Sequence, residues 1–201
     1  MFPETLRRTL MPIELGIWRL NGDRAEKIHF SSPQAERKLE NVLYQDISIL
    51  DDALLVIGRQ IATPHGKFID ILAINIEGDL SILELKRDRT PRDVVAQILD
   101  YAWWVRTLTY EQIASLYSEH HNGEKFEQAF CERFGTNPPE KLNEDHQLVI
   151  VATELDNSTE RIVNYLSLGY GVPINAAFFE YFPLGKPPAL LGDSRSLTIP
   201  G

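Results

Sequence analysis

The sequence predicts an α/β fold in which helices flank both faces of a mixed β-sheet. Three observations favour this class. Apolar stretches with strand-like spacing dominate the region before residue 87, an amphipathic helical stretch follows Thr90, and a strand-helix-strand succession begins near residue 147. The 201 residues are 43% hydrophobic and 24% charged, a composition that is typical of a globular domain and excludes a disordered or fibrous chain.

The N-terminal third is predicted to contain mainly strands. Two strands over 13–20 and 25–30 are separated by an Asn-Gly-Asp turn signal. A helix should follow them, because Ser31 or Ser32 can cap its N-terminus and Pro33 suits its first turn. The three strands expected next span 53–60, 67–76 and 80–86.

The clearest helix signal follows the last of these strands. We expect Thr90 to cap this helix, Pro91 to take its first position and Asp93 to complete a capping-box-like pattern. Its apolar stripe comprises Val94, Gln97, Tyr101, Trp104 and Leu108. The remaining elements are helices over 110–119, 124–134 and 158–168 and strands over 147–152 and 173–182.

The pattern divides the chain into a β-hairpin extension over 1–30, a main domain over 31–186 and an irregular tail over 187–201. The single cysteine, Cys131, excludes an intrachain disulfide and fits a reducing compartment. No apolar run approaches the ~18 residues of a membrane span, and the first residues lack the apolar core of a signal peptide. We therefore expect a cytoplasmic protein with no membrane partner.

The net charge of −9 argues against a protein that binds nucleic acid through a broadly basic surface. It remains compatible with an enzyme that holds a divalent metal. Such an enzyme needs carboxylates, and the metal then supplies the positive charge where a phosphate binds.

Three charged residues lie within the two apolar strands expected over 67–76 and 80–86. They are Asp70, Glu84 and Lys86. Charges inside such strands are costly unless they bind a metal or a partner. Glu84 and Lys86 are two residues apart and leave the same face. A three-residue connection at 77–79 would place Asp70 opposite Lys86, so that all three converge at the open end of a hairpin.

This trio suits the hydrolysis of phosphodiester bonds. Two carboxylates, with the main-chain carbonyl of Leu85, provide the hard oxygen ligands that Mg²⁺ prefers. The metal would polarise the phosphate and help to generate hydroxide. Lys86 would orient the attacking water or stabilise the developing charge.

The pattern Asp70-X13-Glu84-X-Lys86 resembles the core of the PD-(D/E)XK nucleases. Gln97 and Tyr101 on the following helix are similar to the supplementary motif of the RecB-like branch. Their spacing is closest to the nuclease domain of the NucS/EndoMS endonucleases and related domains of unknown function. The resemblance implies a restriction-endonuclease-like fold, Mg²⁺- or Mn²⁺-dependent cleavage of DNA, and active-site positions for Gln97 and Tyr101.

Members of this family also carry a glutamate on the helix before the hairpin. Glu36 and Glu40 lie one turn apart on the same helix face, so the sequence leaves open which of them fills that position, with a slight preference for Glu36. The proline of the family name is replaced by Ile69. About 30 residues precede the first helix, too few for the separate N-terminal DNA-binding domain of NucS/EndoMS, so mismatch or branch specificity is not carried over.

Basic residues near the trio are candidates for contact with the phosphate backbone of DNA. They are Arg87, Arg89 and Arg92 beside the last strand, together with His65 in the loop before Asp70. A solvated loop explains the arginines equally well, and a plain loop histidine is the favoured explanation of His65.

Two readings compete with a free-standing nuclease: a non-catalytic DNA-binding or interaction module, and a nuclease domain detached from a larger protein. The sequence leaves open DNA versus RNA, double-stranded, branched or single-stranded substrates, and endonuclease versus exonuclease action. A homodimer would suit cleavage of both strands.

Overall fold

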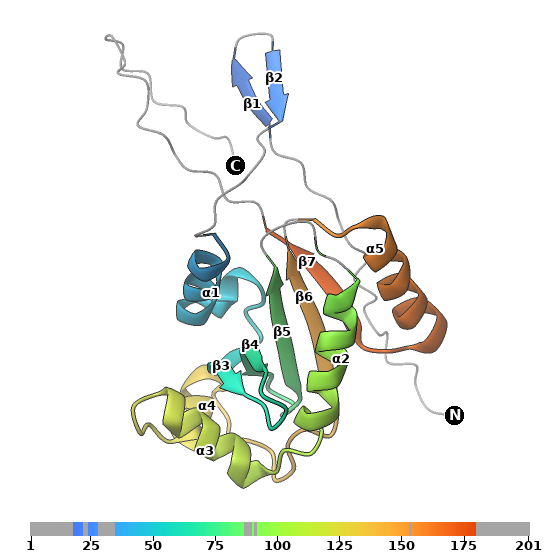
Figure 1. The fold of residues 1–201 in the computed structure, drawn as a ribbon. Helices are drawn as coiled ribbons and strands as arrows, with labels where there is room; N and C mark the ends of the chain where they lie inside the picture. Colours follow the sequence, from blue (N-terminus) through green and yellow to red (C-terminus); the bar gives the residue numbers. More distant parts are fainter. Residues whose placement is uncertain are drawn as a thin grey trace, which may run out of the picture.

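The computed structural model describes residues 18–21, 24–27, 35–86, 90, 92–152 and 154–179; for 18–21, 24–27, 35 and 36 it describes the backbone only. A five-stranded sheet with the order β3-β4-β5-β6-β7 forms its centre (Figure 1). Its strands are β3 (Leu55–Ala62), β4 (Phe68–Ile74), β5 (Leu80–Lys86), β6 (His146–Ala152) and β7 (Ile174–Phe178). The first three strands are antiparallel and the last three are parallel, as a mixed sheet requires.

Helices cover both faces of this sheet, so the predicted fold class, a mixed sheet flanked by helices, is confirmed. The helical elements are α1 (Ala35–Gln45), η1 (Ile47–Ile49), α2 (Asp93–Val105), α3 (Tyr110–His120), α4 (Phe126–Phe134), α5 (Asn157–Asn164) and η2 (Tyr165–Gly169). Within the part of the chain that the structure describes, none of the helices combines the length and apolar character needed to cross a bilayer.

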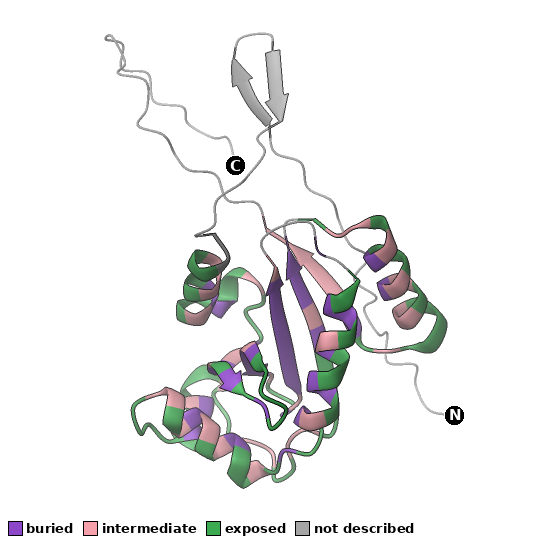
Figure 2. Ribbon diagram, in the orientation of Figure 1, coloured by how far each residue is buried: buried purple, intermediate pink, exposed green. Residues whose placement is uncertain are grey.

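The core consists of two layers separated by the sheet. Figure 2 shows that the central strands are buried along most of their length. On one face, α1 and η1 pack through Leu43 and Ile47 onto Ile71, Leu83 and other residues of the sheet. The opposite face carries the larger cluster, to which α2, α3, α4 and α5 contribute. Residues at the carboxyl end of β5 therefore lie between α1 and α2.

The connection between β4 and β5 differs from the prediction. Ile74 is paired with Leu80, and Asn75 N–H donates to the carbonyl of Asp79, 3.0 Å away. The predicted pairing of Asp70 with Lys86, which assumed a three-residue connection, is therefore wrong. The observed register of β4 against β5 is shifted by two residues. Gly78, with φ of 87°, lies in this turn, where glycine adopts the left-handed region without steric cost.

The start of α2 also differs from the prediction. Arg92, not Thr90, occupies the N-cap position, and its side chain makes no capping hydrogen bond. Thr90 is buried and forms a parallel bridge with Leu155, and its carbonyl accepts a hydrogen bond from the hydroxyl of Thr159, 2.9 Å away. These long-range contacts hold Thr90 in extended backbone, so the helix begins later than the local sequence indicates.

The outer parts of the chain are described only in part. β1 (Trp18–Asn21) and β2 (Arg24–Lys27) pair antiparallel, where the sequence predicts strands over 13–20 and 25–30. The remaining residues of those two predicted strands lie outside the described residues, as do 180–186 and the tail expected over 187–201.

Candidate active site

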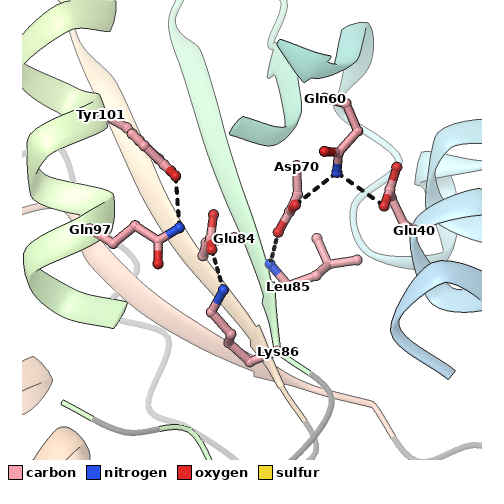
Figure 3. Close-up of polar contacts among 8 residues, drawn as sticks. All are labelled: Glu40, Gln60, Asp70, Glu84, Leu85, Lys86, Gln97 and Tyr101. Carbon is pink, nitrogen blue, oxygen red and sulfur yellow. Dashed lines mark hydrogen bonds and ion pairs between the residues drawn. The ribbon is translucent and has the colours of Figure 1, made fainter. Parts of the chain in front are cut away.

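The carboxylate of Asp70 lies where β4 and β5 separate. Their pairing ends at Ile71 and Leu83, and Asp70 is the next residue along β4 beyond the paired region. The Oδ2 atom of Asp70 accepts a hydrogen bond of 2.7 Å from the main-chain N–H of Leu85 on β5. Its Oδ1 atom accepts a second hydrogen bond, 2.9 Å long, from Nε2 of Gln60 on β3 (Figure 3). Hydrogen bonds from two neighbouring strands thus fix the orientation of this carboxylate.

Glu84 and Lys86 lie on the face of β5 that is directed toward α2. Leu80 and Ile82, which share this face, belong to the larger core cluster. The side chain of Glu84 is 1% exposed and that of Lys86 is 28% exposed, and the Lys86 ammonium donates to Oε1 of Glu84. The pair therefore places one fully buried charge against one that reaches solvent.

Gln97 and Tyr101 of α2 approach this pair from the helix side. Nε2 of Gln97 donates a 2.7 Å hydrogen bond to the hydroxyl of Tyr101, whose ring is buried. Burial raises the pKa of Tyr101, and the negative charges of Glu84 and Asp70 raise it further, whereas Lys86 and the hydrogen bond from Gln97 lower it. Tyr101 therefore lies within electrostatic range of the three charged residues of the predicted site.

Of the two helix glutamates, the structure brings Glu40 to the site. Its Oε2 atom accepts a hydrogen bond of 3.2 Å from Nε2 of Gln60, the nitrogen that also donates to Asp70. Burial raises the pKa of Glu40, with a further rise from the negative charge of Asp70. The side chain of Glu36 lies outside what the structure describes.

Gln60 is a site residue that the sequence analysis missed. It lies directly across from Asp70 in the register of β3 and β4, which pairs Arg59 with Ile71 and Ile61 with Ile69. Its backbone adopts φ of 50°, and its side chain joins the carboxylates of α1 and β4. The available signal was its polar character beside Arg59 in a strand of mainly apolar residues, but polar residues there are also typical of an exposed edge strand.

The predicted nucleic-acid contacts lie around the site in different ways. His65 is exposed in the turn between β3 and β4, and Arg92 is exposed at the N-terminus of α2. Arg87 and Arg89 lie outside the described residues. The structure therefore describes two of the four basic candidates, His65 and Arg92, and both lie on the surface.

The donor set fits a hard divalent cation that is only partly enclosed by protein. Among the residues that the structure describes, no three His, Cys, Asp or Glu side chains gather closely enough to form a metal cage. Mg²⁺ is usually bound through one or two carboxylates, with waters and substrate phosphates as its other ligands. Asp70 and Glu84, with the carbonyl of Leu85, provide that kind of set.

Comparison with known proteins adds the following. No protein-family model matches the chain. Among solved structures, a repair endonuclease from Pyrococcus abyssi is similar at 16% identity and a TM-score of 0.41, over 75% of this chain and 49% of that one. The structure of EndoMS in a dsDNA complex is similar at 16% identity and a TM-score of 0.42, over 78% of this chain and 49% of the EndoMS chain. The structure of EndoMS in apo form is similar at 14% identity and a TM-score of 0.44, over 78% of this chain and 51% of the EndoMS chain. The chain spans about half the length of these proteins, and a likeness at these values does not establish a shared activity.

Proposed function

We propose that this protein is a divalent-metal-dependent nuclease that hydrolyses phosphodiester bonds of DNA. The observation that carries the proposal is the hydrogen bond from the main chain of Leu85 to Asp70, because Leu85 lies between Glu84 and Lys86, which form an ion pair. An ion pair with a buried carboxylate contributes little to stability, so its presence beside a second carboxylate supports a ligand-binding role. DNA as the substrate comes from the resemblance of the Asp70, Glu84, Lys86, Gln97 and Tyr101 pattern to PD-(D/E)XK nucleases.

Each of these side chains has a chemical task in the proposed reaction. Asp70, Glu84 and the Leu85 carbonyl would hold Mg²⁺ or Mn²⁺, which would supply Lewis-acid polarisation of the phosphate and a more acidic water. Lys86 reaches solvent from its contact with Glu84, so its ammonium can orient the attacking water or stabilise the charge that develops on the phosphate.

Gln97 and Tyr101 act on the α2 side of the same site. Tyr101 keeps its proton because burial and the nearby carboxylates raise its pKa, so its hydroxyl remains available as a donor to a phosphate oxygen. Glu40 is an additional ligand or a partner reached through water. Arg92 and His65, both exposed, are the candidates for contact with the DNA backbone outside the site.

The experiment is a cleavage assay with labelled duplex and single-stranded DNA in Mg²⁺, in Mn²⁺ and in EDTA. We expect cleavage with either metal and none in EDTA. Asp70→Asn and Lys86→Met should each lower the rate by roughly 100-fold or more, the size of effect seen when a group that stabilises transition-state charge is lost. Asp100→Asn, which changes an exposed carboxylate on α2, should cleave at the wild-type rate.

A specific observation also favours a second function, a non-catalytic interaction module. The net charge of −9 is unusual for a protein that approaches DNA. This alternative predicts no cleavage under any condition and equal DNA binding by wild type and Asp70→Asn. Cleavage that the Asp70 and Lys86 variants retain in full would contradict the proposed site while leaving a nuclease activity to be explained.

A further inference from the structure

Gln60 has a backbone conformation that is rare for its residue type. Its φ of 50° lies in the left-handed region, which glutamine occupies only at a cost in stability. The other non-glycine residues with positive φ in the described part of the chain are Asn122 and Asn143, and asparagine tolerates this region better. Gln60 also lies inside a strand, where extended backbone is the rule.

The irregularity at Gln60 coincides with a reversal of the side-chain pattern in the neighbouring strand. Residues two apart in a strand normally share a face. Ile71 packs in the cluster beneath α1, whereas Ile69 packs in the cluster on the opposite face of the sheet. The residue between them is Asp70, which lies directly across from Gln60. The reversal therefore occurs at the position where the two polar side chains meet.

The side chain of Gln60 links two carboxylates from different elements. Nε2 lies 2.9 Å from Oδ1 of Asp70 on β4 and 3.2 Å from Oε2 of Glu40 on α1 (Figure 3). A primary amide carries two N–H bonds, so one group can donate to both carboxylates. The amide is neutral, and it holds two negatively charged groups together without supplying a countercharge.

We propose that Gln60 is a positioning residue for the cation site: its left-handed backbone turns the Gln60–Asp70 pair out of the regular strand pattern, and its amide holds Asp70 and Glu40 in the orientation that receives the cation. This inference rests on the proposed function. Partners that orient a metal ligand without touching the metal typically contribute 10- to 100-fold to metal affinity. The strain at Gln60 is then a cost to the fold that serves the site.

A purely structural role for Gln60 makes a different prediction. If the residue mainly ties α1 to the sheet, removing its side chain lowers the melting temperature. Under our proposal, Gln60→Asn and Gln60→Gly keep or raise the melting temperature, because asparagine and glycine adopt positive φ more easily. Neither side chain reaches both carboxylates in the way that glutamine does, so both variants should bind Mn²⁺ roughly 10- to 100-fold more weakly.

The test measures free Mn²⁺ by electron paramagnetic resonance during titration of the protein, with and without a DNA duplex, beside thermal melts of the same samples. Gln147→Asn, an exposed glutamine at the start of β6, is the matched control and should behave as wild type. Weaker Mn²⁺ binding at an unchanged or higher melting temperature supports the proposal. Wild-type Mn²⁺ affinity in both variants, or weaker binding together with a lower melting temperature, overturns it and leaves the nuclease proposal standing. Absence of Mn²⁺ binding by the wild type in both conditions overturns both.

Discussion

Glu84 allows a ligand-binding role to be separated from a structural one. Its side chain is 1% exposed and forms an ion pair with Lys86, which is 28% exposed. We predict that Glu84→Gln changes the free energy of unfolding by less than about 2 kcal/mol, because the partly exposed Lys86 can extend its ammonium into water and is not left as an unpaired buried charge. A carboxylate whose main task is to hold the fold together would show a clear loss of stability instead.

The predicted magnitude follows from opposing contributions at this position. An ionised carboxylate pays several kcal/mol of desolvation on burial, whereas a buried amide pays roughly 1–3 kcal/mol. The substitution also removes the attraction to Lys86, worth about 4 kcal/mol for two charges 4 Å apart at an effective dielectric constant of ~20. Lys86 recovers part of this loss because its ammonium can extend into water. The contributions therefore nearly cancel.

Urea unfolding followed by tryptophan fluorescence measures the effect. Glu140→Gln changes an exposed glutamate in a loop and controls for the chemistry of the substitution. Ile82→Ala removes a fully buried neighbour on the same strand face and should cost about 2–5 kcal/mol, which shows that the assay detects core damage. A loss above about 2 kcal/mol in Glu84→Gln, with Glu140→Gln unchanged, would refute the reasoning and assign Glu84 to the fold.

Two further predictions concern packing and pH. In Gly58→Ala the new Cβ would lie 2.7 Å from Cγ and Cδ2 of His120, so α3 or the imidazole ring must shift. We expect urea unfolding to show a loss of about 1–3 kcal/mol in the free energy of unfolding. An unchanged urea midpoint would contradict this and show that His120 moves freely. Burial and the nearby charge of Glu124 raise the pKa of Tyr117 to about 12, so between pH 10 and 12 the unfolded chain loses this proton before the folded one does. The free energy of unfolding should therefore fall as pH rises, and Tyr117 should account for about 1.4 kcal/mol of the fall at pH 11. Urea unfolding of Tyr117→Phe at pH 9 and pH 11 should lack that part of the decline. An equal decline in the wild type and the variant would contradict the prediction.

The strands that carry the site could be predicted because their signals are local. The strand expected over 80–86 has the same bounds as β5, since its apolar residues follow directly after the turn signal Glu77-Gly78-Asp79. The helix expected over 110–119 differs from α3 by one residue, because Thr109 and Gln112 form a capping box that fixes its start.

The rest depends on contacts between distant residues. The start of α2 is set by the bridge between Thr90 and Leu155, which no local pattern encodes. Glu36 and Glu40 are equivalent in the helix repeat, and the placement of Glu40 beside Gln60 becomes visible only when α1 is packed on the sheet. The left-handed backbone of Gln60 contradicts the preference of its residue type, so a reading based on propensity passes over it.

The central claim is that Asp70 and Glu84 form a divalent-cation site. Crystals of the wild type and of Asp70→Asn, soaked in MnCl₂ and measured for anomalous scattering of manganese, test it directly. We predict a manganese ion in contact with both carboxylates and with the carbonyl of Leu85 in the wild type, and its loss in Asp70→Asn. Manganese bound only elsewhere, or an unchanged ion in the variant, would contradict the account.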